Sequence, residues 1–173
     1  MNPLLNIAIY QLVWFIAVLG GEGLVWLGLL VLTAHFFLSP RPQSDLLLAL
    51  VVLLIGVLVD GLLRQIGVFV FVEDRFPLPF WLMLIWVALA TLLTHSLRWL
   101  APRPWLAVVC GACGGPLAYV AGVRLGVAAF GVSTPAAIVL LAVVWGALVP
   151  LLLHLGGRLV VATDQPLLKR YGR

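Results

Sequence analysis

The sequence predicts an all-α polytopic membrane protein: a bundle of six transmembrane helices that forms one domain over residues 1–162. Of its 173 residues, 64% are hydrophobic and only 9% are charged, whereas a soluble domain carries about a quarter charged residues. So few charges cannot cover the surface of a water-soluble globule, so we expect lipid to be the outer solvent. The apolar residues also fall into six runs, and a helix needs about 20 such residues to cross a bilayer.

Residues that disfavour helices separate the six runs. Three glycines and Glu22 follow the first run, and Pro40 and Pro42 follow the second; glycine weakens a helix interior and proline removes a backbone donor. Asp45 is placed to cap the third helix. The predicted helices cover residues 3–19, 24–38, 45–67, 80–100, 105–125 and 135–160. The polar, basic segment 163–173 is expected to be a short cytoplasmic tail.

The loop cations predict the orientation of the bundle. Six spans place both termini on one side of the membrane, and positive residues favour the cytoplasmic side. The side shared by the termini holds seven cations and the opposite side holds three: Arg41, Arg98, Arg103, Arg158, Lys169, Arg170 and Arg173 against Arg64, Arg75 and Arg124. We therefore expect both termini in the cytoplasm of a bacterium, with the protein in its inner membrane. This placement of the net charge of +4 fits topology rather than nucleic-acid binding, so membrane lipid is the expected partner.

Ionisable residues near the outer face form the first candidate site. They are Glu22, Asp60, Arg64 and Arg124, and Tyr119 is a further ligand candidate. Ionisable groups inside a bilayer are costly and often functional. Asp60 and Arg64 lie one helical turn apart and can pair. We expect Asp60 to face the bundle interior and to bind Arg64 or Arg124. The group would then either line a polar cavity that opens outward or form a structural ion-pair network.

Histidines and arginines near the inner face form a second candidate group. His35, His95 and His154 are predicted to lie at similar depth, but they lack the close histidine spacing of metal sites and have only loop carboxylates nearby. We therefore expect neither a metal nor a cofactor. His95, Arg98 and Arg103 are instead candidates for binding lipid headgroups.

Two further patterns concern helix packing. Asn6 and Gln11 are candidates for hydrogen bonds between helices. On the fifth segment, small residues recur every four positions, which predicts close approach of a neighbouring helix or a homo-oligomer or partner interface through this face. The stripe consists of Cys110, Gly114, Ala118, Gly122 and Gly126. Cys110 and Cys113 have CxxC spacing, but their apolar setting favours a packing role over a redox role.

Four stretches of the sequence, read in order, form a recognisable set: Asn6–Phe15, Leu58–Asp60, Thr94–Trp99 and Gly114–Tyr119. Together they resemble a bacterial inner-membrane family of unknown function, catalogued as domain of unknown function 2878. The resemblance covers nearly the whole chain. It implies a small inner-membrane protein and brings no known activity or catalytic residue.

Three functions fit these patterns. The first is binding or transport of a small or lipid-like molecule through the polar layer near the outer face. The second is a membrane-embedded enzyme, or an enzyme partner, in lipid modification at the inner leaflet. The third is a scaffold for another membrane protein. An enzyme needs an acid, base or nucleophile that converge in one pocket, and Asp60 with Arg64 suits binding at least as well as catalysis.

Overall fold

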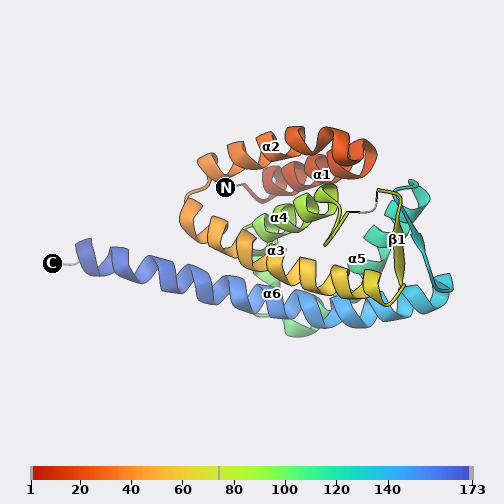
Figure 1. Cartoon of the computed structure of the whole chain (residues 1–173). Coiled ribbons are helices and arrows are strands. Elements are labelled where there is room, and N and C mark those ends of the chain that lie inside the picture. Colours follow the sequence, from red (N-terminus) through yellow and green to blue (C-terminus); the bar gives the residue numbers. More distant parts are fainter. Residues whose placement is uncertain (1, 74, 172–173) are drawn as a thin grey trace.

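The computed structural model describes residues 2–73 and 75–171, and their side chains as far as residue 159. Within this part of the chain, six α-helices carry the fold (Figure 1). They are α1 (Pro3–Gly20), α2 (Val25–Leu38), α3 (Pro42–Gln65), α4 (Phe80–Thr94), α5 (Pro104–Arg124) and α6 (Thr134–Tyr171). Two 3-10 turns, η1 (Gly21–Leu24) and η2 (Arg98–Leu100), and two strands, β1 (Phe69–Phe71) and β2 (Ala128–Phe130), lie between them.

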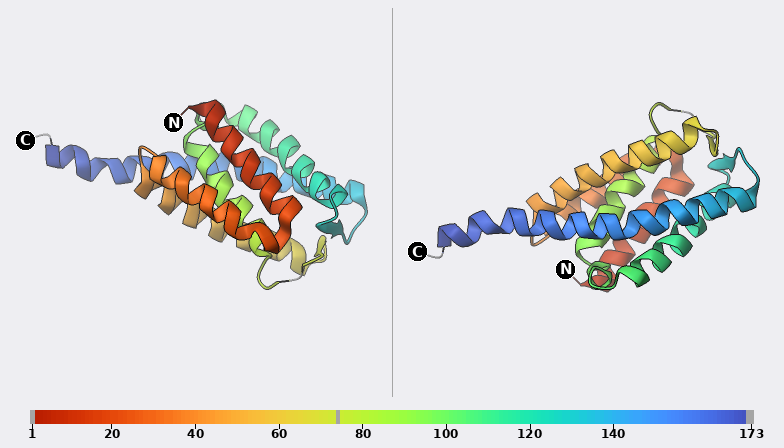
Figure 2. Two further views of the ribbon diagram at one scale, coloured as in Figure 1. Left: turned by 90° about the horizontal axis from the view of Figure 1, so that it is seen from above. Right: turned by 90° about the horizontal axis from the view of Figure 1, so that it is seen from below.

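The helices run back and forth between two ends of the bundle (Figures 1 and 2). One end, called here the terminal end, holds Asn2, the α2–α3 turn and η2. The other, called the hairpin end, holds η1 and the two strands. The chain reverses at η1, where Gly21 adopts a φ of 51°, a left-handed conformation that glycine tolerates better than other residues.

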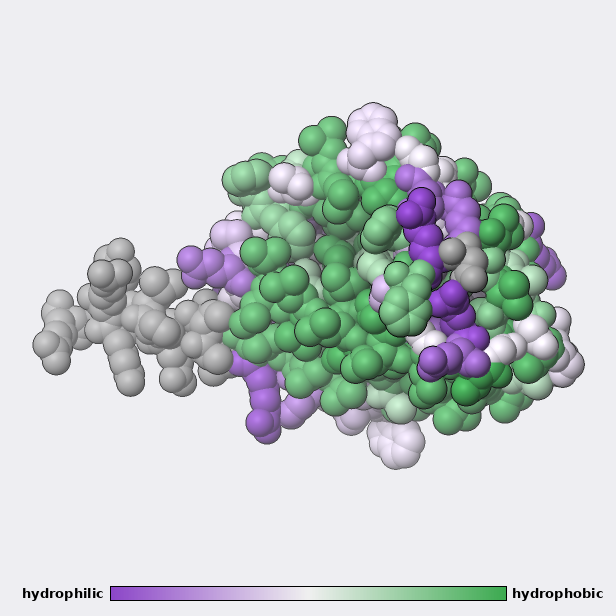
Figure 3. Space-filling view, viewed as in Figure 1, coloured by the Kyte–Doolittle hydropathy of each residue, from purple (hydrophilic) through white to green (hydrophobic). Residues whose placement is uncertain are grey.

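Length and composition allow four segments to cross a membrane: Pro3–Leu38, Pro42–Gln65, Pro104–Arg124 and Thr134–Leu159. The first of these contains both α1 and α2. Helix α4 is apolar but shorter, at 15 residues. The all-α class predicted from the sequence is thus confirmed, with four segments able to cross a membrane where six spans were predicted. Figure 3 shows hydrophobic residues over most of one face, with hydrophilic side chains gathered in a band near the hairpin end.

Several predicted helix boundaries were wrong. Helix α3 begins at Pro42, with Arg41 as its cap residue, because proline is favoured at the first helical position. Asp45 is therefore not the cap, and its side chain is buried in the first turn. Helix α4 ends at Thr94, short of the predicted residue 100, and the intervening residues form η2. Helix α6 continues to Tyr171, beyond the predicted end at residue 160.

The two strands pair at the hairpin end and were not predicted. They are antiparallel, with Phe69 opposite Phe130 and Phe71 opposite Ala128. The pairing joins the α3–α4 connection to the α5–α6 connection, so this end of the bundle is covered by a small sheet.

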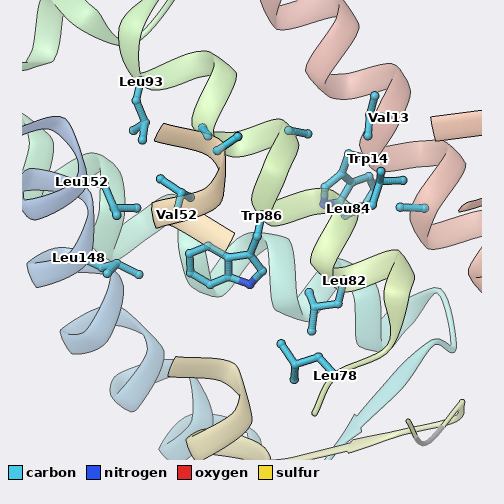
Figure 4. Close-up of a cluster of buried hydrophobic side chains, with 14 of the residues drawn as sticks. Val13, Trp14, Val52, Leu78, Leu82, Leu84, Trp86, Leu93, Leu148 and Leu152 are labelled. Atoms are coloured by element: carbon cyan, nitrogen blue, oxygen red, sulfur yellow. The ribbon is translucent and has the colours of Figure 1, made fainter. Parts of the chain in front are cut away.

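Helix α4 lies at the centre of the core. Its residues are buried on more than one face, and it contacts α1, α2, α3 and α6. Figure 4 shows the Trp86 ring among apolar side chains from several helices. This central position stabilises the short helix, because the neighbouring helices bury its side chains.

Candidate functional site

Two stacked tryptophans connect α4 to α6 at the middle of the bundle. The rings of Trp86 and Trp145 have centroids 5.2 Å apart and an interplanar angle of 19°. Each ring rests on a glycine of a neighbouring helix. A Cβ added to Gly56 would lie 2.2 Å from Trp86, and one added to Gly115 would lie 2.2 Å from Trp145. Both glycines are therefore needed for the rings to fit.

Asp60 lies one turn after Gly56 and is fully buried. Its carboxylate accepts a hydrogen bond of 2.8 Å from Trp86 Nε1 and one of 2.6 Å from Tyr119 Oη. The prediction that Asp60 faces the interior is confirmed. The predicted arginine partner was wrong, because two neutral donors from α4 and α5 occupy the carboxylate instead. Hydrogen bonds of this kind compensate the desolvation of a buried polar group.

A groove of about 310 Å³ runs along α5 beside this group. Helices α1 and α4 form its other walls, and Trp145 and Val149 of α6 also line it. Residues at its two ends are Trp99 and Leu100 of η2 and Ala128 of β2. Along α5, the lining extends from Cys110 to Gly122, which at about 1.5 Å per residue corresponds to about 18 Å.

The groove wall is almost entirely apolar and aromatic. Five of the seven tryptophans line it: Trp14, Trp81, Trp86, Trp99 and Trp145. Tyr119 also lines it, with its ring stacked on Phe69 at 4.9 Å and its hydroxyl directed to Asp60. The site therefore offers a long hydrophobic channel with one polar group deep in its wall.

The small-residue stripe of α5 forms a wall of the groove. Cys110, Gly114, Ala118 and Gly122 all line it. Within the described part of the chain, a Cβ on Gly114 would meet nothing within 4 Å. Of the two alternatives expected for this face, close packing against another helix of the bundle is therefore not found at Gly114, and an interface with a second copy or a partner stays a prediction. Helix α5 packs on α6 (Figure 2) through the adjacent face, where a Cβ on Gly111 would lie 2.1 Å from the Trp145 carbonyl oxygen.

The other predicted outer-layer residues do not join Asp60. Glu22 lies at the hairpin end, where its carboxylate is 3.4 Å from Arg75 and accepts a 2.6 Å hydrogen bond from the Phe80 backbone. Arg64 donates to the Pro77 carbonyl oxygen at 3.3 Å. Arg124 is exposed at the end of α5. Of the residues predicted for the first candidate site, Asp60 and Tyr119 thus lie beside the groove, whereas Glu22 and Arg64 contact the α3–α4 connection at the hairpin end.

A second polar cluster lies at the terminal end, around Asp45. Thr94 donates to the Asp45 carboxylate at 3.0 Å, Ser39 also donates to it, and His95 Nε2 lies 3.7 Å away. The expectation that only loop carboxylates lie near the histidines was wrong, because Asp45 belongs to the first turn of α3. The ring of His35 is buried against His95, with centroids 5.7 Å apart. Among the described residues, no group of three potential ligands could hold a metal ion.

The predicted headgroup residues separate into two environments. His95 points into the Asp45 cluster, and only 8% of its side chain is exposed. Arg98 and Arg103 are exposed beside Trp99. The Arg103 guanidinium lies 5.6 Å from the centroid of the Trp99 ring, a distance typical of cation–π contact. His154, the third histidine of the predicted layer, is exposed on α6.

Sequence reasoning missed the two tryptophans that organise the site. A pattern that points to them is a glycine followed four residues later by a polar group, which occurs as Gly56 with Asp60 and as Gly115 with Tyr119. This spacing places a gap and a hydrogen-bonding group on the same helix face, one turn apart. A large ring with a polar edge fits such a pair, and Trp86 fills the gap and binds the carboxylate on α3.

Comparison with known proteins identifies one family that covers most of the bundle. Neither the curated proteins nor the solved structures gave a match for this chain. The family model described as "Protein of unknown function (DUF2878)" matches residues 3–151. The match includes α1 to α5, the strands and the part of α6 that carries Trp145. This chain therefore belongs to the DUF2878 family, whose function is unknown.

Proposed function

We propose that this protein binds or carries a lipid-like molecule and holds its hydrocarbon chain in the groove beside α5. The observation that carries this proposal is the groove itself, a long apolar space whose wall is kept open by four small residues. Glycine and alanine have little or no side chain, so an extended hydrocarbon chain can lie close to the backbone of α5. Binding pockets for small molecules are mostly apolar with few polar groups, and this groove has that composition.

The pair formed by Asp60 and Tyr119 supplies the polar feature of the proposed site. The Tyr119 hydroxyl donates a hydrogen bond to the Asp60 carboxylate, so the lone pairs of its oxygen are left to accept a hydrogen bond from a ligand. A hydroxyl group within a largely apolar ligand suits such an acceptor. A charged carboxylate or phosphate does not suit this depth, since the nearby Asp60 would repel it.

The proposal includes a topology of six membrane spans with both termini in the cytoplasm, in a bacterial inner membrane. The alternation of the helices between two ends supports it, as does the excess of cations on the terminal side. Helices α2 and α4 have 14 and 15 residues, about 21–23 Å of rise, which is short of the hydrocarbon thickness of about 30 Å. In this topology the turns at the ends of α2 and α4 cover the remaining thickness, and the neighbouring helices separate these turns from lipid.

The proposed binding can be tested with the protein's own tryptophans. Replacing the two tryptophans outside the groove, Trp26→Phe and Trp105→Phe, leaves only the five that line it; the removed side chains are 62% and 81% exposed. Phosphatidylcholine with brominated chains quenches tryptophans that it contacts. We expect strong quenching in this background and a large loss of quenching when Gly114→Leu fills the groove.

The matched control is Gly157→Leu on α6. In the described structure a Cβ at either glycine would meet nothing within 4 Å, so both changes add a side chain to open space, and only Gly114 lines the groove. Equal quenching in the Gly114→Leu and Gly157→Leu proteins would contradict the proposal.

A second candidate function is an enzyme, or an enzyme partner, that acts on lipid near the terminal end. The contact between Asp45 and His95 favours it, because a carboxylate that orients an imidazole is common in proton transfer. Lipid profiles of cells producing the wild-type protein or His95→Gln would test it. A lipid species that changes with the wild type and not with His95→Gln supports this function, and identical profiles argue against it.

A further inference from the structure

The groove ends beside two exposed arginines, and this juxtaposition indicates which lipid it holds. Trp99 lines the groove, and the Arg103 guanidinium lies over its ring and donates to the Trp99 carbonyl oxygen at 3.4 Å. Arg98 precedes Trp99 in η2 and is exposed. The cations therefore lie on the short segment that closes the groove at the terminal end.

The surrounding charges favour an anion at this end. Helix α5 begins at Pro104, so the positive end of its dipole also lies here. Among the side chains that the structure describes, Glu22 and Glu73 lie at the hairpin end, and Asp45 and Asp60 are buried. No described exposed carboxylate therefore competes for Arg98 and Arg103 at the terminal end.

The hairpin end is less suited to a charged headgroup. Phe71, Val127 and Ala128 cover the groove there. Arg75 is paired with Glu22, whose carboxylate lies at 3.4 Å. The deep wall carries the Asp60 carboxylate, which disfavours an anion further inside. A ligand with one anionic end and one apolar chain therefore fits in one direction only.

We infer that the occupant is an anionic phospholipid, with its phosphate held by Arg98 and Arg103 and one acyl chain lying along the stripe of α5. This inference rests on the proposed function and adds the headgroup and the direction of the ligand. The groove follows α5 from Cys110 to Gly122, about 18 Å, which suits a single extended acyl chain. Gly114 and Cys110 are exposed along its side, so the second chain stays in the bilayer.

The test uses the full chain with Trp26→Phe and Trp105→Phe, titrated with phosphatidylglycerol or phosphatidylcholine that carry identical brominated chains. We expect phosphatidylglycerol to quench at lower concentration. Each arginine near an anionic lipid strengthens attraction about fivefold, so Arg98→Gln with Arg103→Gln should reduce the preference about 25-fold. Arg158→Gln is the control, because Arg158 is an exposed cation of α6 that does not line the groove.

The two proposals fail in different ways. Equal quenching by both lipids in the wild type, or a preference that survives loss of both arginines, overturns the phospholipid inference and leaves chain binding intact. Quenching by a brominated fatty acid but by neither phospholipid identifies a free fatty acid instead and also overturns it. If Gly114→Leu changes none of these signals, chain binding itself is wrong. Arg98→Gln alone, which leaves the Arg103 contact with Trp99 in place, should give an intermediate preference if the double variant is poorly folded.

Discussion

Gly115 and Trp145 are packed so closely that a single methyl group on the glycine would lie 2.2 Å from the indole ring. Both glycines line the groove, but at Gly114 an added Cβ would meet no described atom within 4 Å. Two adjacent glycines on α5 thus have opposite roles: one permits contact with α6 and the other keeps a space open.

These roles predict opposite effects of the same substitution. Gly115→Ala should lower stability by about 1–3 kcal/mol, because the core must shift to accept the added carbon. Gly114→Ala should leave stability unchanged or raise it by about 0.5–1 kcal/mol, because alanine favours helix and meets no obstacle. Thermal unfolding of both proteins in the same detergent measures the difference. A more stable Gly115→Ala protein would show that α5 and α6 are further apart than described.

Loss of the Tyr119 hydroxyl should weaken the link between α3 and α5. Tyr119→Phe removes one of the two donors to the buried Asp60 carboxylate, which should lower stability by about 1–3 kcal/mol. Tyr10→Phe is the control, since Tyr10 also lines the groove but is not a partner of Asp60. Thermal unfolding of the two variants should separate them clearly, and equal melting temperatures would mean that the Asp60 contact contributes little.

Asn6 should anchor α1 to α4. Its side-chain oxygen accepts hydrogen bonds from the Ser96 hydroxyl at 2.5 Å and from the Ser96 backbone at 3.3 Å, and its amide donates to the Thr91 carbonyl oxygen at 3.3 Å. Asn6→Ala should reduce stability by about 1–2 kcal/mol, since polar contacts between membrane helices contribute up to about 1.7 kcal/mol each. Gln11→Ala should have no effect, because Gln11 is exposed. Refolding yield or resistance to detergent would show whether the two differ as expected.

The proposed topology predicts the side of each loop. A reporter fused after Arg173 should be active only in its cytoplasmic form, and one inserted after Val72 in the α3–α4 connection should be active only in its periplasmic form. The second fusion is the control for the orientation of the hairpin end. The proposed topology has three crossings, α4, α5 and α6, between Val72 and Arg173. Activity of both reporters in the same compartment would mean that the chain crosses the membrane an even number of times between these two points.

The sequence was sufficient for the helical class, for most breaks between helices and for the inward-facing positions of Asn6 and Asp60. The prediction that Gln11 also bonds to another helix was wrong, because its side chain is exposed. Apolar runs and helix breakers are local features, and a polar residue in an apolar run must find a partner. The partners themselves were not predictable, because Trp86 and Tyr119 belong to other helices and one sequence does not say which helices are neighbours. The groove was missed for the same reason. A stripe of small residues fits close helix contact and an open wall equally well, and only the position of α1 relative to α5 decides between them.

The terminal-end cluster shows the same limit at a helix boundary. A carboxylate near the start of a helix suggested capping, but Pro42 begins α3 one turn earlier. That shift turns Asp45 inward, where it meets Thr94 and His95 of the α4 end. Because α3 begins three residues earlier than predicted, Asp45 lies within the helix and is buried.

The two cysteines allow the groove to be labelled without introducing a new residue. Both thiols are free and exposed, but only Cys110 belongs to the groove lining, and Cys113 lies outside it. A bulky maleimide or a spin label at Cys110 would compete with whatever fills the space, whereas the same group at Cys113 would project elsewhere from α5. Cys110 can therefore report on the groove, with Cys113 on the same helix as its reference. In a Cys113→Ser protein, the rate of alkylation of Cys110 should fall when a ligand occupies the groove.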